Sequence, residues 1–244
     1  MPAGKTFPLC LFHKKRLYRK FLIRASGGTN ASENADRHKG DSVRKNLTFL
    51  HSGMEFAIRD PGQVYKGLWE GPDDCSARIR IGVEKETIHI HARVTDRCHV
   101  QKHHGRFLFF GDSIQIGLTF DRICRDEFFF YNFQAGLTDS GPELHFTGAP
   151  PQYRGPYPVD SLLPSRFCSI VPTPDGLEYE LFLPLEVLHP FSPETDGKRL
   201  NFFLRLFNCN GPQEEHVQGG KAILEYPLRS SCWMIGEGWT TLSF

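Results

Sequence analysis

The sequence predicts an all-β protein, an antiparallel sandwich of two sheets with a jelly-roll-like arrangement. Apolar and polar residues alternate over several segments, as the two faces of half-buried strands require. Turn sequences such as DPGQ, GPDD, TPDG and ETDG stand between these segments, and the chain holds 23 Gly and 17 Pro. Aromatic residues, which favour strands, make up 13% of the chain.

The clearest strand lies within FFGDSIQIGLTF, Phe109 to Phe120, where Ile114, Ile116 and Leu118 share one face. The polar face of that segment, which includes Gln115, is expected to begin as the floor of a ligand site and to continue as an outer sheet surface. One short helical turn is expected at Leu183–His189. The ten or eleven expected strands lie near 47–58, 76–83, 86–95, 107–120, 127–135, 143–147, 166–172, 177–183, 199–209, 221–227 and 238–244.

Two regions of opposite charge divide the chain. Residues 1–46 hold eleven Lys or Arg and three Asp or Glu, a net charge of +8, and the remainder has a net charge of −7. We therefore expect a basic, poorly ordered lead over 1–46 and one β-sandwich domain over 47–244. Aromatic residues do not interleave with the basic run HKKRLYRK as single-strand binding prefers, so a nucleic-acid partner is not expected.

Several function classes lack their sequence signals. No apolar run approaches the length of a membrane-spanning helix, and FPLCLF is too short for a signal-peptide core. Seven cysteines occur without a C-x-x-C pair. A G-x-S-x-G elbow, a phosphate-binding loop and a dinucleotide fingerprint are also missing, so no catalytic residues are predicted.

A motif of about 50 residues links the first half of the domain to a known family. It begins with Trp69, Gly71 and the pair Asp73-Asp74, continues through VTDRCHVQ, and ends with an aromatic residue before GDSIQ. The motif resembles that of the family 9 carbohydrate-binding module, a DOMON-like accessory domain of secreted bacterial proteins that degrade polysaccharides. The resemblance extends more weakly to the closing strands, so that it covers about 47–244.

The resemblance implies a sandwich that stacks a terminal sugar between two aromatic rings. The matching ring positions are Phe109, or Phe110 if the register slips by one, and Tyr226. The acidic hydroxyl acceptor of the family falls on Gln115, and its late Asn-Asp pair falls on Asn208 and Cys209. Here Phe and Tyr stand where strongly binding members have Trp, and about Phe130 stands where they have Arg.

A sugar site needs flat aromatic area and a few polar groups with fixed geometry. Trp69 and Trp233 are further candidates for the rings, and Asn132, Gln134 and Asn208 join Gln115 as candidates for the polar groups. The alternative is that these rings belong to the core, as most of the 21 Phe must. For Trp69 the alternative is packing beneath the GPDD turn.

Other functions and sites stay open. A glycoside hydrolase would need paired carboxylates such as Asp73 and Asp74, although adjacent turn residues point apart. A haem-binding domain would need an axial ligand such as Met54 or Met234, and a structural or protein-interaction sandwich needs no ligand. His89 and His91 could face one metal.

The resemblance also bears on cofactor and location. It suggests a structural calcium at Asp96, Asp112 and Asp121, and otherwise no cofactor. It further implies a poly- or oligosaccharide partner and an extracellular or periplasmic location, whereas the sequence leaves the sugar and the oligomeric state open.

Overall fold

The computed structural model describes residues 53–84, 86–120, 130–190, 199–209, 222–227 and 240–243. The predicted lead over 1–46 lies outside these residues, as do Asp121, Trp233 and Met234. The boundary between the lead and the domain therefore stays a prediction. Within the described part, no helix is both long enough and apolar enough to cross a membrane.

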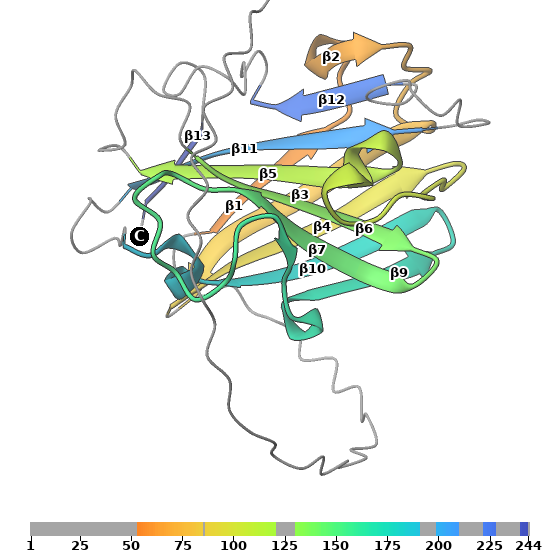
Figure 1. Cartoon of the computed structure of the whole chain (residues 1–244). Coiled ribbons are helices and arrows are strands. Elements are labelled where there is room, and N and C mark those ends of the chain that lie inside the picture. The colour runs from red at the N-terminus through yellow and green to blue at the C-terminus, as the bar shows by residue number, and fades with distance from the viewer. Residues whose placement is uncertain are drawn as a thin grey trace, which may run out of the picture. The chain divides into compact units, whose positions relative to one another are not determined.

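Two antiparallel sheets form the described domain, which confirms the predicted fold class (Figure 1). The smaller sheet has the order β1-β3-β4-β10-β9. The larger has the order β2-β12-β11-β5-β6-β7-β8, with β13 also paired to β11. The strands are β1 (Gly53–Ile58), β2 (Val64–Gly67), β3 (Cys75–Glu84), β4 (Thr87–Asp96), β5 (Ser113–Phe120), β6 (Tyr131–Thr138), β7 (Gly141–Gly148), β8 (Ser161–Leu162), β9 (Cys168–Thr173), β10 (Gly176–Pro184), β11 (Arg199–Asn208), β12 (Ala222–Tyr226) and β13 (Thr240–Ser243).

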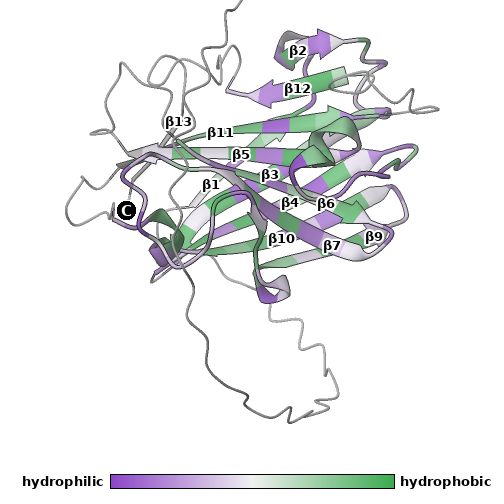
Figure 2. Cartoon of the chain, viewed as in Figure 1, coloured by the Kyte–Doolittle hydropathy of each residue, from purple (hydrophilic) through white to green (hydrophobic). Residues whose placement is uncertain are grey.

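The core lies between the inner faces of the two sheets. Ile79, Ile90 and Leu181 enter it from the smaller sheet and are fully buried. Ile116 and Phe133 meet them from the larger sheet. Bands of opposite hydropathy alternate along the strands in Figure 2, as the two-residue side-chain period requires.

The outer faces of the two sheets differ in chemistry. On the smaller sheet the outer face carries ion pairs, such as Arg80 with Glu55 at 2.9 Å. On the larger sheet the outer face carries amides, aromatic rings and one buried ion pair, between Arg205 and Glu225. The larger sheet is therefore the surface that offers varied ligand chemistry.

The structure departs from the expected elements in three places. Residues 105–110 form a 3₁₀ turn, η2 (Gly105–Phe110), so the strand expected from residue 107 begins only at Ser113. Strands β2 and β8 were not predicted, because each is too short for an alternation to be seen. The expected turn at 183–189 is confirmed as η4 (Leu185–Leu188); the other 3₁₀ turns are η1 (Pro61–Gln63) and η3 (Ser165–Phe167).

Candidate functional site

A groove of about 640 Å³ lies on the outer face of the larger sheet. Its volume falls within the range of about 300 to 1,000 Å³ typical of small-molecule sites. Six strands, η2 and two residues outside these elements supply its lining. They are Tyr65, Lys66, Arg106, Phe107, Phe109, Gln115, Asn132, Gln134, Thr147, Arg205, Phe207 and Ile223, together with Phe130 directly before β6 and Asp160 from the β7–β8 connection.

A row of polar side chains crosses the sheet beneath this groove. The strand register pairs Glu225 with Arg205, Arg205 with Gln115, Gln115 with Gln134, and Gln134 with His145. All five residues share the parity opposite to the core residues of their strands, so they occupy one face. Gln115, whose outward direction the sequence predicted, is thus one member of a polar row that runs across the sheet from β12 to β7.

The side-chain amides at the bottom of the groove form only some of the hydrogen bonds that they could form with one another. Gln115 donates from Nε2 to Oδ1 of Asn132 at 3.0 Å. Gln134 is only 3% exposed, yet its Oε1 has no hydrogen-bond partner within the described residues. A buried acceptor without a donor is unfavourable, so this oxygen is available to a ligand hydroxyl.

Tyr65 and Arg205 form one side of the groove. Ile223 pairs with Lys66 and Leu224 with Val64, so Tyr65 is an extra residue in β2 where the register shifts. Such a bulge redirects a side chain. The Tyr65 ring lies 4.5 Å from the Arg205 guanidinium carbon and remains 49% exposed. The pair provides a flat surface that faces solvent.

An aromatic wall, which we define as Phe107, Phe109, Phe110 and Phe207, forms another side; Phe110 packs against Phe109 and is not itself part of the lining. The centroids of Phe109 and Phe110 are 4.3 Å apart, and those of Phe109 and Phe207 are 6.4 Å apart. Three of the rings come from η2, which packs on β5, β6 and β7 and is anchored by the fully buried Leu108. Phe107 is 48% exposed.

The residues of the family-like motif hold η2 in place. Gln101 donates from Nε2 to the carbonyl oxygens of Leu108 at 2.8 Å and Asp112 at 3.1 Å, and its Oε1 accepts from the His103 N–H. A Cβ atom on Gly111 would lie 2.4 Å from Gln101 Oε1, so only glycine permits this approach. Gln101 of the H-x-Q element and Gly111 of the G-D-S element therefore hold the aromatic wall in position.

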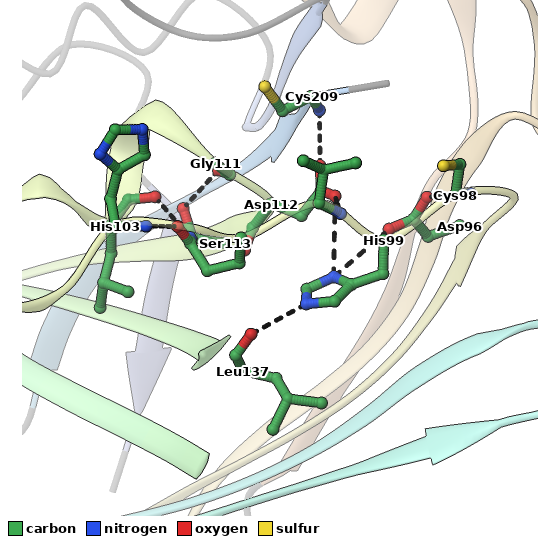
Figure 3. A network of polar contacts seen from close by, with 12 residues as sticks. Asp96, Cys98, His99, His103, Gly111, Asp112, Ser113, Leu137 and Cys209 are labelled. Carbon is green, nitrogen blue, oxygen red and sulfur yellow. Dashed lines mark hydrogen bonds and ion pairs between the residues drawn. The ribbon is translucent and has the colours of Figure 1, made fainter. Parts of the chain in front are cut away.

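Asp112 ties the start of β5 to two distant segments (Figure 3). Its carboxylate accepts from the N–H groups of Val100 and Cys209, and His99 Nδ1 lies 3.6 Å from its Oδ2. Burial, followed by the nearby charge of Asp96, raises the pKa of Asp112 to about 7. Asp112 belongs to the support of the groove, not to its lining.

The structure brings four predicted site residues together and separates the others. Phe109, Gln115, Asn132 and Gln134 all line the groove. Tyr226 instead shares the inward parity of Leu224, and its ring stacks on Phe56 with centroids 3.9 Å apart. The two rings expected to clasp a sugar, Phe109 and Tyr226, therefore lie on opposite faces of the sheet.

The remaining predicted residues lie outside the groove lining. Trp69 packs against the core and donates from Nε1 to the Cys75 carbonyl at 2.7 Å. Asn208 is buried and donates to Asp74 at 3.3 Å. Phe110 lies behind Phe109, with its ring near His103.

Sequence reasoning missed Tyr65, Phe107, Thr147, Arg205 and Phe207. A signal existed for Arg205 and Phe207, because both stand at alternate positions of RLNFFLRLFN, opposite in parity to Leu204 and Leu206. The bulge that turns Tyr65 toward the groove had no counterpart in the sequence.

A second groove, of about 740 Å³, runs along β1, β3 and β4. Its lining includes Arg59, Arg78 and Arg93, and its aromatic residue, Phe56, is already stacked against Tyr226. Arg78 pairs with Glu55 and Arg93 with Asp175, and the Phe56 ring is already covered, so the groove on the larger sheet is the better candidate.

No family model and no curated protein matches the chain. Among solved structures, the fold is similar to that of a family 9 carbohydrate-binding module from Caldicellulosiruptor kristjanssonii in complex with cellotriose. The TM-score is 0.50, with 12% identity over 76% of this chain and 80% of that chain. A module of the same family and organism in complex with glucose gives a TM-score of 0.47, with 12% identity over 75% and 81%. The first of these two structures confirms, at the level of the fold, the resemblance predicted from the motif.

Proposed function

We propose that this chain is a non-catalytic carbohydrate-binding domain and that the groove on the larger sheet binds the sugar. The observation that carries the proposal is the combination, in one groove, of exposed aromatic surface with unsatisfied amide chemistry. Tyr65 and Phe107 offer flat apolar area, and Gln134 offers a buried oxygen without a donor. Pyranose rings present the complementary pattern of C–H faces and hydroxyls.

The fold likeness supports the same class of ligand. The similar module of Caldicellulosiruptor kristjanssonii was solved with cellotriose bound. In this proposal Tyr65, and not Tyr226, is one of the two aromatic rings that stack on the sugar, and Phe109 is the other. Phe130 stands where strongly binding family members have Arg. In this chain Arg205, on β11, supplies a charged group to the groove instead.

We further propose that the domain assists an enzyme that degrades polysaccharides. A domain that holds a glycan beside an exported enzyme raises the effective concentration of the substrate. Asp160 is the one carboxylate among the described residues that line the groove, so the carboxylate pair of a glycoside hydrolase is not assembled there, and Asp74 and Asp112 are buried elsewhere. The groove therefore serves recognition in this proposal.

Calorimetry of the full chain against a panel of glucose, cellotriose, xylo- and manno-oligosaccharides tests the proposal. We expect micromolar to millimolar binding to at least one glycan. Tyr65→Ala and Phe109→Ala should each weaken it tenfold or more, whereas Tyr226→Leu should not, with folding of each variant checked by circular dichroism. Binding to none of the glycans, or binding lost only in Tyr226→Leu, would reject the proposal.

A further inference from the structure

Three potential metal ligands converge between the end of β4 and the start of β5 (Figure 3). His99 Nδ1 lies 3.7 Å from Asp96 Oδ2 and 3.6 Å from Asp112 Oδ2. Asp96 ends β4, His99 follows it, and Asp112 precedes β5. The three ligand atoms all lie within 4.8 Å of one another.

The tautomer of His99 follows from its other ring nitrogen. Nε2 lies 2.9 Å from the Leu137 carbonyl oxygen, which can only accept, so Nε2 carries a hydrogen. In the neutral ring, Nδ1 then presents a lone pair to two carboxylate oxygens. It has no hydrogen-bond partner within the described residues, and 3.6 Å is too long for such a bond. A lone pair and two carboxylate oxygens that face one another repel, and either a metal ion among them or a proton on one of them removes this repulsion.

Each of the three side chains is held in position by a further bond. Leu137 orients His99, the Cys98 N–H donates to Asp96 Oδ1 at 2.9 Å, and the Cys209 N–H donates to Asp112 Oδ1. Metal sites characteristically orient their ligands through such outer partners. A histidine whose remote nitrogen donates to a backbone carbonyl is the usual form of this arrangement.

Space exists beside the carboxylates. Asp96 and Asp112 are at least nine-tenths buried, and a void of about 10 Å³ borders both, although His99 is not part of its lining. That volume is about the minimum that holds one water. The void also borders Asn208, which is 1% exposed and whose Oδ1 has no partner within the described residues. A metal-bound water there could donate to this oxygen.

The donor set fits a transition metal better than calcium. Calcium takes oxygen ligands, whereas the third donor within the described residues is an imidazole nitrogen, and Asp121 lies outside them. Zinc accepts imidazole and carboxylate at about 2.0 to 2.2 Å, which sets two ligands of a tetrahedral site about 3.3 to 3.6 Å apart. The separations from His99 Nδ1, 3.6 and 3.7 Å, are close to that range.

We propose that Asp96, His99 and Asp112 bind one zinc-class divalent metal ion, with a water as the fourth ligand. The ion ties the end of β4 to the start of β5, and through Cys209 to the end of β11. It thereby stiffens the support of the aromatic wall and has a structural role, independent of sugar binding.

A second cluster, His91 with Glu178 and Glu180, provides a matched control. His91 Nε2 already lies at hydrogen-bond distance, 2.9 Å, from Glu178 Oε1. In the strand register its neighbours are Arg80 and Glu180, and Arg93 pairs with Glu178. A half-buried hydrogen bond beside two arginines explains this cluster without a metal.

The test uses the full chain, stripped with a chelator and titrated with Zn²⁺ and Co²⁺. We expect one ion per chain, a visible Co²⁺ spectrum of tetrahedral type without thiolate charge transfer, and a higher Tm with Zn²⁺. His99→Gln and Asp96→Asn should lower the affinity at least tenfold, whereas His91→Gln should leave it unchanged.

Several results would overturn the site. They are no metal uptake by the wild-type chain, uptake unchanged in His99→Gln, uptake lost in His91→Gln, or a thiolate band in the Co²⁺ spectrum. Displacement of Co²⁺ by equimolar Ca²⁺ would overturn the metal class. If Asp96→Asn does not fold, the wild-type spectrum and His99→Gln still decide.

Discussion

Arg205 donates two hydrogen bonds to a single oxygen of Glu225, from Nε at 3.1 Å and from Nη2 at 3.0 Å. The two residues face each other across β11 and β12, and both side chains are almost fully buried. The pair sets the guanidinium of Arg205 beneath the Tyr65 ring. One ion pair thus determines the geometry on one side of the groove.

Removal of only the carboxylate should be costly. Glu225→Leu removes the buried carboxylate that accepts two hydrogen bonds from Arg205, so we expect a loss of about 3 to 5 kcal/mol in the free energy of unfolding. The double variant Arg205→Met with Glu225→Leu should recover most of it, because no charge then remains. Urea denaturation measures both, and equal losses in the single and double variants would contradict the interpretation.

Gly117 should tolerate no side chain. A Cβ atom there would lie 1.9 Å from Cε1 of the fully buried Phe203, its cross-strand partner. We expect Gly117→Ala to lower the free energy of unfolding by about 1 to 3 kcal/mol. Adding Phe203→Leu should reduce this penalty in a double-mutant cycle.

Gly148→Ala is the matched control for that change. Its Cβ atom would meet only Asn132 Cβ, at an ordinary 3.7 Å. We expect a change within about 0.5 kcal/mol, as for substitutions without a specific clash. If Gly148→Ala were as harmful as Gly117→Ala, backbone entropy or strand propensity, and not the Phe203 contact, would be the cause.

Substitution of Gln101 should lower both the stability of the domain and its affinity for sugar. Gln101→Leu removes the donor shared by the Leu108 and Asp112 carbonyls and the acceptor for the His103 N–H. We expect a loss of about 1 to 3 kcal/mol in unfolding free energy, as for buried groups left without partners. Because η2 carries Phe109, sugar affinity by calorimetry should fall as well; unchanged affinity would show that the wall holds itself in place.

His104 and Glu143 should give a measurable pH dependence. The hydrogen bond to Glu143, 2.6 Å from Nδ1, raises the pKa of His104. Burial opposes ionisation of Glu143, but the Gly105 N–H and His104 outweigh it and lower its pKa. The His104 contribution is complete below about pH 6.5 and fades as the pH rises through its raised pKa. The Glu143 contribution is complete above about pH 4.5 and fades as the pH falls through its lowered pKa.

The stabilisation from this pair should therefore be greatest between about pH 4.5 and 6.5. An NMR titration of the His104 ring checks its origin. Glu143→Gln should return the pKa of His104 toward its ordinary value. Asp139→Asn should have a smaller effect, because Asp139 is 82% exposed and contributes less to the shift. A larger effect from Asp139→Asn would assign the shift to the wrong carboxylate.

The sequence alone determined the sandwich and which residues of β5 face outward. In β5 the alternation is strict, so Ile114 and Ile116 had to face the core and Gln115 the outside. The motif residues Gln101 and Asp112 could be recognised by spacing. Their task of holding η2 could not be, because it depends on backbone groups that are brought near only by folding.

Tertiary structure alone decided which rings meet. In KAILEY both parities contain apolar residues, Ile223 on one and Leu224 on the other, so the pattern could not show that Tyr226 faces the core. Pairing with β11 settles that choice, and a register shift in β2 brings Tyr65 over Arg205 instead. Local alternation specifies faces, whereas the register between strands distant in sequence specifies neighbours, and a binding groove is made of neighbours.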